Sequence, residues 1–541
     1  NSTFENTHHY AIYIDANAVT PRPSNIEISN NRFINMYDGI FVDYHDKVSI
    51  RNNTMSNSIS MGSYGIYLNQ VDSATVIENN RIYDPENTLS YGIYLSGCNA
   101  SEENPGRIIN NIIQSFTYGI YMWSDVSYYN LYHNTIYTHS SNPLHIYNSA
   151  PHLSIKNNIM MSDGVSSYIY LGNNSSYVSS AYLDMDYNNI FFSNSSYSPF
   201  KVSSGNYTLS TWQSTFGQDS NSVITDPYFT DSTLVPFSPW MDNMGTPISG
   251  ITLDINGATR SETTPDVGAA EFTGFSGSPL SGSYTIGTGG NYTSMDTLQR
   301  DLTLLGINGP VVLNFLEGTH TEPLALSEVR GSSALNTITF QSADQNASSV
   351  NWQRASISTD NYTNSYILKL NGTDHVKIKH MTFQVTGGYH ISKLRLSGQT
   401  DSISVDSVTF IDTYSSNGRS GYGIYSTSGN PVIGVSVKNC SFTNTPGTRY
   451  VSYGTEITFL SDQINTSIES GLEISNNTLL NSYKGIYIYK YNGITVRGNT
   501  IRGDGQNDKG LRFGYLRGNG IIENNSIYGP ETTSGMYFDY C

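Results

Sequence analysis

Charged residues are scarce in this sequence. Asp, Glu, Lys and Arg together make up 13% of its 541 residues, about half the share in an average soluble domain. This shortage excludes coiled coils, whose apolar seams are flanked by charged residues. Basic residues are the scarcer kind, with 27 Lys and Arg against 44 Asp and Glu and a net charge of −17. An extended surface for phosphate groups is therefore excluded, and we expect no nucleic acid as a partner.

Long apolar runs are also missing. No stretch of the sequence approaches the roughly 18 apolar residues of a membrane span, so no membrane insertion is expected. The N-terminus lacks the charged and then apolar pattern of a signal peptide. The chain starts at Asn1 without a Met, which favours an excised or mature piece of a protein.

Aromatic residues, in contrast, are plentiful. Phe, Trp and Tyr make up 12% of the chain, including 42 Tyr, which excludes a disordered polar chain. A motif of Gly, Ile, an aromatic residue and an aliphatic residue begins at Gly39, Gly65, Gly92 and Gly119, at spacings of 26, 27 and 27 residues. Residues alternate in direction along a strand, so the Ile and the aliphatic residue should point inward and the aromatic residue outward. Short units of this kind bury their apolar face only when they are coiled and stacked as a solenoid.

A second series of motifs lies between the first. It consists of polar pairs, mostly Asn-Asn, each followed one or two residues later by an aliphatic residue or Phe. Stacked Asn amides can hydrogen-bond along a ladder, and Asn tolerates the left-handed conformation that a sharp corner needs. We therefore predict a structural ladder at one corner of the coil. Its expected members are Asn31, Asn53, Asn80, Asn111, Asn134 and Asn158, followed later in the chain by Asn477, Asn499 and Asn525.

These repeats resemble the right-handed parallel β-helix family, which includes pectate lyases, pectin methylesterases and NosD-like repeat proteins. The resemblance covers most of the chain. It implies an all-β fold, a right-handed parallel β-helix solenoid. It is nearly silent on function, because the fold hosts enzymes, adhesins and passive stalks. We expect no cofactor and no metal site.

A longer repeat indicates two consecutive modules in tandem. Residues 26–54 align without a gap on residues 472–500, at an offset of 446, and Gly92 through Cys98 matches Gly535 through Cys541 at an offset of 443. The chain thus begins partway through one module of about 440 residues and ends at the equivalent depth of the next. A disulfide between Cys98 and Cys541, one module apart, is implausible in a rod. We expect free, mostly buried thiols.

The boundary between the modules is expected in the middle of the chain. Five segments from Asp226 to Phe272, including Arg260, resemble in order the closing segment, of the choice-of-anchor Q type, found in secreted bacterial β-helix proteins. The Gly, Ser and Pro residues after it indicate a linker. The expected division is C-terminal rungs of the first module at 1–213, its closing segment at 214–272, a linker at 273–283, and the N-terminal cap and rungs of the second module at 284–541.

A helix is predicted at the start of the second module. Residues 294–305 place Met295, Leu298, Leu302 and Leu305 on one face, with Ser294 as N-cap. Such a helix would cover the apolar end of the solenoid. This opening is similar to that of pectin methylesterases, but their later signature segments, QDTL, DFIFG and GRPW, do not occur in the chain.

Few polar residues are grouped as catalysis would require. Asp43 and His45 lie beside Asp46, but the second copy has Tyr and Asn residues at the equivalent positions, which favours a solvated strand face. Asp184 and Asp186 could bind Ca²⁺ or serve a lyase, yet no basic residue is near them in sequence. The remaining candidates have simpler explanations: Arg51 and Glu78 as an ion pair between rungs, and 254–257 as a turn held by Asx hydrogen bonds rather than a Ca²⁺ loop.

The outward aromatic residues are the candidate ligand-binding surface. Phe41, Tyr67, Tyr94 and Tyr121 recur at one corner and should form a stripe with a spacing of roughly 5 Å, on which sugar rings could stack. The alternative is that these aromatic pairs simply stabilise the sheet. No catalytic residue is assigned.

The leading hypothesis is a non-catalytic extracellular structural or adhesive protein, a segment of a long surface fibre or stalk. Giant surface adhesins of gliding bacteria are the nearest analogy. The location would be extracellular or at a bacterial cell surface. The expected partners are neighbouring modules of the same polypeptide, with surface glycans or a cell-surface anchoring machine as further candidates. The alternatives are a polysaccharide-active lyase, esterase or epimerase, and a phage-type receptor-binding spike, which would usually trimerise.

Overall fold

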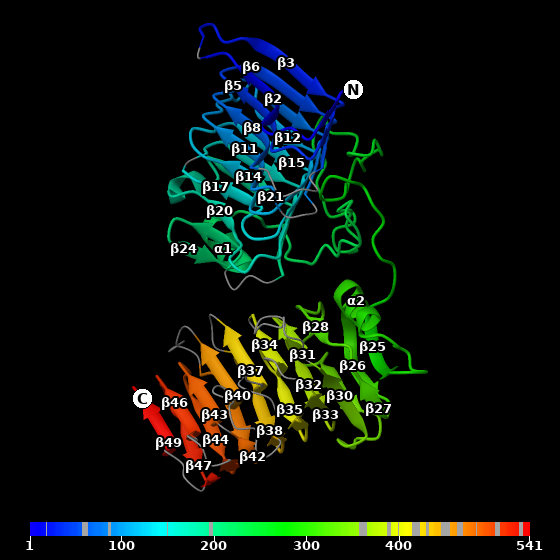
Figure 1. Ribbon diagram of the computed structural model, residues 1–541, viewed down its shortest axis with the longest axis vertical. Coiled ribbons are helices and arrows are strands. Elements are labelled where there is room, and N and C mark those ends of the chain that lie inside the picture. The colour runs from blue at the N-terminus through cyan, green and yellow to red at the C-terminus, as the bar shows by residue number, and fades with distance from the viewer. Residues whose placement is uncertain are drawn as a thin grey trace. The chain divides into compact units, whose positions relative to one another are not determined.

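The computed structural model divides the chain into two compact units, residues 1–276 and residues 277–541 (Figure 1). Both units are built from short strands, and two α-helices occur among the described residues. The structure describes residues 1–17, 19–56, 63–84, 88–148, 150–193, 198–355, 365–386, 391–398, 400–413, 422–428, 432–444, 455–461, 469–482, 484–503, 509–529 and 534–541.

Three sheets make up the first unit, and each turn of the chain adds one strand to each sheet. The first sheet contains β1 (Thr3–Glu5), β4 (Arg32–Ile34), β7 (Thr54–Ser56), β10 (Arg81–Tyr83), β13 (Ile112–Ser115), β16 (Thr135–Thr138), β19 (Ile159–Ser162) and β22 (Asn189–Phe192). The second contains β2 (Tyr10–Asp15), β5 (Asp38–Asp43), β8 (Tyr64–Asn69), β11 (Tyr91–Ser96), β14 (Tyr118–Met122), β17 (Leu144–Ile146), β20 (Ile169–Leu171), β23 (Phe200–Val202) and β24 (Gly205–Tyr207). The third contains β3 (Ser24–Ser29), β6 (Asp46–Arg51), β9 (Val76–Glu78), β12 (Gly106–Ile109), β15 (Tyr129–Tyr132), β18 (Leu153–Lys156) and β21 (Leu183–Asp186), and the short 3-10 helix η1 (Ser175–Val178) precedes β21.

The second unit repeats this plan with three further sheets. The first contains β25 (Leu280–Ile286), β26 (Ile307–Phe315), β29 (Ile338–Ser342), β32 (Val376–Lys379), β35 (Ser404–Asp406), β38 (Ser436–Lys438), β41 (Leu472–Ser475), β44 (Ile494–Arg497) and β47 (Ile521–Glu523). The second contains β27 (Gly318–His320), β30 (Val350–Arg354), β33 (Thr382–Val385), β36 (Thr409–Asp412), β39 (Ser441–Asn444), β42 (Thr478–Ser482), β45 (Thr500–Gly503) and β48 (Ser526–Tyr528). The third contains β28 (Leu324–Leu326), β31 (Tyr366–Asn371), β34 (Ser392–Ser397), β37 (Tyr422–Ser428), β40 (Thr455–Ser461), β43 (Lys484–Tyr489), β46 (Lys509–Gly514) and β49 (Ser534–Asp539).

The strands pair in parallel with like residues in register, as the repeat predicted. Ile40 pairs with Ile66, and Ile66 with Ile93, and all three side chains are fully buried. Among the described strands, the single antiparallel pair joins β23 to β24. Each unit therefore has its own column of stacked aliphatic residues as a core. The predicted all-β, parallel β-helix solenoid is confirmed.

The glycine of the Gly-Ile motif is required by the close approach of successive turns. A Cβ atom placed on Gly65 would lie 2.6 Å from the carbonyl oxygen of Gly92 in the next turn. Real Cβ atoms essentially never come that close to a backbone atom. A side chain here would push neighbouring strands apart, which explains why the motif starts with Gly.

Asparagine side chains form a buried ladder at one corner of each unit, between the third and first sheets of the first unit and between the first and second sheets of the second. Asn53 is typical: its backbone N–H and its Nδ2 both donate to Asn80 Oδ1, at 3.1 and 3.0 Å, and Nδ2 also donates to the carbonyl oxygen of Ile28 at 2.8 Å. The residue before it, Asn52, has a φ of 55°, the left-handed conformation that a sharp corner needs. The same pattern of bonds links Asn31, Asn53, Asn80, Asn111, Asn134 and Asn158, and, in the second unit, Asn477, Asn499 and Asn525.

The ladder extends one residue further than we predicted. Asn158 donates from its backbone N–H and its Nδ2 to Asn188 Oδ1, both at 3.0 Å. The left-handed residue before Asn188 is Tyr187, with a φ of 55°. We predicted no ladder residue here. In the earlier polar pairs the ladder Asn is the second residue, whereas in Asn188-Asn189 it is the first. In the second unit Cys440 takes the place of a ladder Asn, and its backbone N–H donates to Asn477 Oδ1 at 2.9 Å.

Helix α2 (Met295–Leu305) covers the first turn of the second unit, as predicted. Ser294 is its N-cap, with Oγ accepting from the backbone N–H of Asp296 at 3.1 Å. Met295, Leu298 and Leu302 are buried against the core of the second unit. The predicted linker is shorter than 273–283, because β25 already begins at Leu280.

Helix α1 (Leu209–Phe216), which follows the last strands of the first unit's coil, was missed by the sequence analysis. Its Trp212 is fully buried and stacks on Phe200 of β23, with ring centroids 4.8 Å apart. Trp212 Nε1 also donates to Asp219 Oδ2 at 2.9 Å. The helix is short and has few apolar residues, so its period is weak in the sequence. It covers the last turn of the first unit.

The segment predicted to close the first module docks on the outside of the first unit. Asn157 and Thr246 exchange two hydrogen bonds, of 2.7 and 2.9 Å, and Arg260 Nη2 donates to Asn110 Oδ1 at 2.9 Å. Arg260 is 3% exposed and pairs with Glu271 at 2.7 Å, and burial lowers the pKa of its guanidinium. The segment is thus built into the first unit.

All three cysteines are free. Cys98 and Cys440 are buried, and Cys541 is exposed. Burial raises the pKa of the Cys98 thiol to about 12, so this thiol is not a nucleophile at neutral pH.

Candidate functional site

The predicted aromatic residues form a continuous ridge on the second sheet of the first unit. Parallel pairing places one ring of each turn above the ring of the previous turn. Phe41 and Tyr67 have ring centroids 4.9 Å apart, Tyr67 and Tyr94 are 4.7 Å apart, and Tyr94 and Tyr121 are 5.2 Å apart. The full column, which we call the aromatic ridge, consists of Tyr13, Phe41, Tyr67, Tyr94, Tyr121, His145 and Tyr170.

Two rings of the aromatic ridge are largely closed to solvent. Phe41 is 8% exposed and Tyr121 is 5% exposed, because neighbouring rings cover them. Tyr121 is stacked on Tyr94 at an interplanar angle of 9° and on His145 at 13°. Both faces of this ring are therefore occupied by protein, and a ligand approaching it would meet the ring edge. Burial also raises the pKa of Tyr67, to about 12.

The accessible aromatic faces lie beside the column, at residues that the sequence analysis did not single out. Trp123 and Tyr147 stack on each other with centroids 4.3 Å apart at 12°, and they are 40% and 39% exposed. Tyr13, at one end of the ridge, is 57% exposed. Trp123 lies one residue after Met122, the aliphatic position that ends the motif. The repeat therefore did not single it out. A flat ligand would stack on this Trp123–Tyr147 platform more readily than on the four predicted rings.

The third sheet supplies the basic residue that Asp184 lacks in the sequence. Lys156 Nζ lies 2.6 Å from Asp184 Oδ2, because β18 and β21 are adjacent strands. Tyr132 pairs with Lys156 in the strand before, and burial raises the pKa of the Tyr132 hydroxyl. Asp186 is occupied in a turn, where it accepts from the backbone N–H and the Nδ2 of Asn221 at 2.7 and 2.8 Å.

The other polar candidates have structural roles. Asp254 Oδ1 accepts from the backbone N–H groups of Asn256 and Ala258 at 2.8 and 2.7 Å, the Asx turn that was predicted there. Arg51 Nε lies 3.7 Å from Glu78 Oε2. In the second copy the equivalent Arg497 pairs instead with Glu473, at 3.1 Å.

No metal site is indicated in the described part of the chain. His45 and its acidic neighbours belong to no group of three or more potential metal-ligating side chains there. His45 Nδ1 lies 2.6 Å from the backbone oxygen of Asp43. Across the described residues, no helix is both long and apolar enough to cross a membrane.

One family model matches part of the chain. The model described as "Right handed beta helix region" matches residues 1–160 and 38–216. No curated protein matches the sequence. Among solved structures, pectin methylesterase from Aspergillus niger is similar at 12% identity and a TM-score of 0.29, covering 49% of this chain and 86% of that one. An alginate lyase of the PL6 family is similar at 11% identity and a TM-score of 0.28, covering 94% of this chain and 72% of that one.

Sequence identities and TM-scores as low as these carry no argument about the activity of this chain. The family match and the strand pairing do bear on the fold, and they agree. Residues 1–216 match the right-handed β-helix family, and both units have its parallel, all-β solenoid fold.

Proposed function

We propose that the chain is a non-catalytic structural or adhesive segment of a long extracellular fibre or stalk, built from β-helix modules of about 440 residues. The contrast between the two aligned copies carries the proposal. Residues 26–54 and 472–500 have the same succession of strands, β3 to β7 and β41 to β45. In both, a buried Asn joins the ladder with the same bonds, Asn53 in one and Asn499 in the other.

The polar residues considered for catalysis, in contrast, differ between the copies, and His45 is buried rather than on the solvated strand face expected from the sequence. Asp43 and His45 are replaced by Tyr489 and Tyr491. A catalytic site belonging to the module would need the same reactive groups in each copy, whereas a scaffold needs only its ladder and core. In this proposal the partners are neighbouring modules of the same polypeptide and surface glycans, and the location is a bacterial cell surface.

The aromatic ridge and the Trp123–Tyr147 platform would supply the adhesive contacts. One exposed aromatic pair gives a weak site, and repetition of the module along a fibre would raise the avidity of many such sites. The platform can be tested by glycan binding. Trp123→Ala combined with Tyr147→Ala should abolish binding, whereas Tyr67→Ser, Tyr94→Ser and Tyr121→Ser should weaken it less, because those rings pack against their neighbours in the column. Equal binding by all variants would remove the ridge and the platform as ligand surfaces.

A polysaccharide-active enzyme is the second candidate, and one observation favours it. Lys156 lies beside Asp184 and pairs with Tyr132 on one exposed sheet face, which places a cation, a carboxylate and a phenol together. Proton abstraction from a sugar acid needs a base and a cation that stabilises the carbanion.

The two candidates are separated by an activity assay. The full chain is incubated with pectins, alginates and other uronic-acid polysaccharides, and ultraviolet absorbance of unsaturated products and release of methanol or acetate are followed. We expect no product. Product formation that is lost in Lys156→Ala would overturn the fibre proposal in favour of the enzyme.

A further inference from the structure

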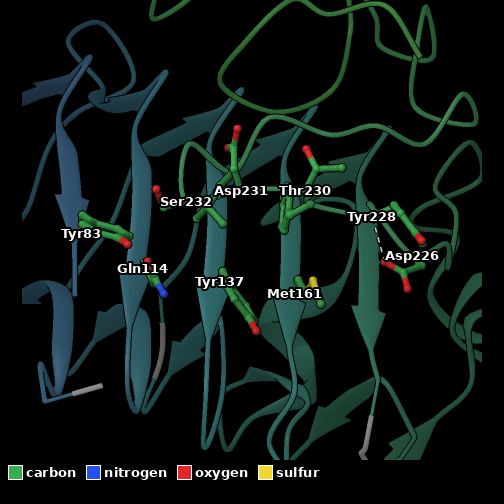
Figure 2. A pocket seen from close by; sticks show the side chains of 11 residues that line it. Tyr83, Gln114, Tyr137, Met161, Asp226, Tyr228, Thr230, Asp231 and Ser232 are labelled. Atoms are coloured by element: carbon green, nitrogen blue, oxygen red, sulfur yellow. Dashed lines mark hydrogen bonds between the residues drawn. The ribbon is translucent and has the colours of Figure 1, made fainter. Parts of the chain in front are cut away.

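A groove runs along the outside of the first unit, between the first sheet and the closing segment (Figure 2). Its volume is about 410 Å³. One residue from each of four successive strands forms its floor, Tyr83, Gln114, Tyr137 and Met161, and these lie in a row in Figure 2. Three intervals of about 4.8 Å make this floor ~14 Å long, which is the length of a trisaccharide.

The opposite wall is formed by part of the closing segment and is held in place independently of any ligand. It comprises residues 226–234, with Asp231, Thr230 and Ser232 above the floor in Figure 2. The backbone N–H of Tyr228 donates to Asp226 at 2.7 Å and that of Thr233 donates to Asp231 at 2.8 Å. Leu234 is anchored in an apolar cluster with Ile112 and Ala269. A preformed wall reduces the entropy that a ligand would have to overcome.

Gln114 points to a ligand that carries hydroxyl groups. Its side chain is 8% exposed. Its Nε2 lies 3.0 Å from His139 Nε2, but its buried Oε1 has no hydrogen-bond partner in the described part of the chain. A buried polar atom without a partner is costly. A hydroxyl donates and accepts equally well, so it would satisfy Gln114 in either orientation of the amide.

Aromatic side chains lie on either side of Gln114 in the floor, and Tyr137 is held in place by its neighbours. Tyr137 donates to Asp163 Oδ2 at 3.0 Å, and His139 Nδ1 lies 3.3 Å from the same oxygen. Tyr137 also packs near Phe229, with ring centroids 6.2 Å apart. Tyr83 offers a further ring at one end of the floor. Aromatic rings with carboxylates and amides around them suit the apolar faces and hydroxyl edges of a sugar ring.

The charge of the groove selects against acidic sugars. Two carboxylates, Asp226 and Asp231, line it, and no Lys or Arg is among the described residues around it. A uronate would bring its own negative charge against them, whereas neutral hydroxyl groups would donate to these carboxylates in charge-assisted hydrogen bonds. We propose that this groove binds a neutral oligosaccharide of about three sugar units, with Tyr83 as a stacking platform and Gln114 and Asp231 as hydrogen-bonding partners. The groove is distinct from the aromatic ridge, and it would be present in a fibre and in an enzyme alike.

The test is calorimetric titration of the full chain with cellotriose, maltotriose, mannotriose and laminaritriose, each up to about 10 mM. Trigalacturonate is titrated in parallel as the acidic sugar. Tetramethylammonium chloride is titrated to see whether the aromatic rings and carboxylates of the groove bind an organic cation instead. We expect at least one neutral trisaccharide to bind, and trigalacturonate to bind at least about tenfold more weakly. Tyr83→Ala should weaken the neutral ligand about tenfold, and Asp231→Asn by a few fold. Urea unfolding of each variant shows whether its fold is intact.

Tyr182→Ala is the matched control, because it removes an exposed aromatic ring that belongs neither to the groove nor to the aromatic ridge and its platform. It should leave the affinity within about twofold. Four outcomes would overturn the proposal: no binding by any of the four neutral trisaccharides, equal binding of trigalacturonate, binding of tetramethylammonium alone, or a loss of affinity in Tyr182→Ala while Tyr83→Ala keeps its full affinity.

Discussion

Each ladder asparagine satisfies several buried backbone groups at once, which makes this amide hard to replace. Asn111 donates from Nδ2 to the backbone oxygen of Ile77 at 2.9 Å and to Asn134 Oδ1 at 3.0 Å, and its Oδ1 accepts from the backbone N–H and the Nδ2 of Asn80. No other side chain of this size offers a donor and an acceptor in the same geometry. The repeat of Asn in the sequence follows from this requirement.

We expect Asn111→Ala to lower the free energy of unfolding by about 2–4 kcal/mol. The substitution leaves the backbone N–H of Asn80 and the carbonyl oxygen of Ile77 buried without their hydrogen-bond partner. Urea unfolding followed by circular dichroism measures this change. The control is Asn206→Ala, at an exposed position in β24, which should change the stability by less than about 0.5 kcal/mol. Similar effects of the two substitutions would show that the ladder contributes little.

Asp219 should make the stability of the first unit depend on pH. It is 1% exposed and accepts from Trp212, and burial raises its pKa from 3.8 to about 6. The folded state therefore holds a proton that the unfolded state releases, so the free energy of unfolding should fall as the pH rises from about 4 to about 6. Above that range Asp219 adds no further pH dependence.

Asp219→Asn should remove this dependence. Between pH 4 and pH 7 the free energy of unfolding of the unmodified chain should fall by up to about 3 kcal/mol relative to that of the variant. Urea unfolding at several pH values measures this difference. Asp266, whose pKa burial also raises to about 6, is present in both proteins, so its contribution cancels. Parallel pH curves for the two proteins would contradict the shifted pKa.

At the scale of the element, the two helices perform one task in different places. A solenoid leaves an apolar cross-section where its strands stop. Helix α2 covers that section at the start of the second unit, and α1 covers it at the end of the first. The sequence analysis found α2 because four apolar residues share one face over three turns. It missed α1, where one large residue, Trp212, makes most of the buried contact.

We expect Leu298→Ala in α2 to lower the stability of the second unit by about 2–5 kcal/mol, because the side chain is fully buried against the first rungs. Thr303→Ala is the control on the same helix, at a partly exposed position, and should be neutral or slightly stabilising since Ala favours helix. Unfolding curves of the two variants check this. Equal stability of both would mean that the helix does not act as a cap.

At the scale of the whole molecule, the two units have separate hydrophobic cores in the described part of the chain. We expect residues 1–276 and residues 277–541 each to fold alone, and urea unfolding of the full chain to be the sum of their two transitions. Residues 1–225, which keep helix α1 and Asp219 but lack residues 226–276, provide the control. Without the closing segment, Asn157 loses Thr246 and Asn110 loses Arg260, so this fragment should be less stable than residues 1–276. An unfolded 1–276 fragment, or one with the stability of 1–225, would contradict this division.

Much of the fold is predictable from the sequence alone, because its contacts are periodic. The strand period, the Gly-Ile motif and the Asn pairs each report contacts that recur every turn, so one turn predicts the next. The match of residues 26–54 to 472–500 likewise predicts the same strands in both units. The choice of Asn188 as a ladder residue was not predictable in this way, because the pair at Asn188 and Asn189 obscured the register by one position.

The candidate sites depend on tertiary structure for a physical reason. Coiling brings Lys156 to Asp184 from the preceding turn, and the covering of Tyr121 by its neighbours depends on ring orientations that no residue pattern encodes. The groove beneath 226–234 exists only because the closing segment folds back over strands that lie roughly 65 to 150 residues earlier in the chain. The sequence by itself determined the repeating architecture, whose contacts are periodic. Only the tertiary structure decided which side chains meet, stay open or lack a partner, because those contacts join positions that share no period.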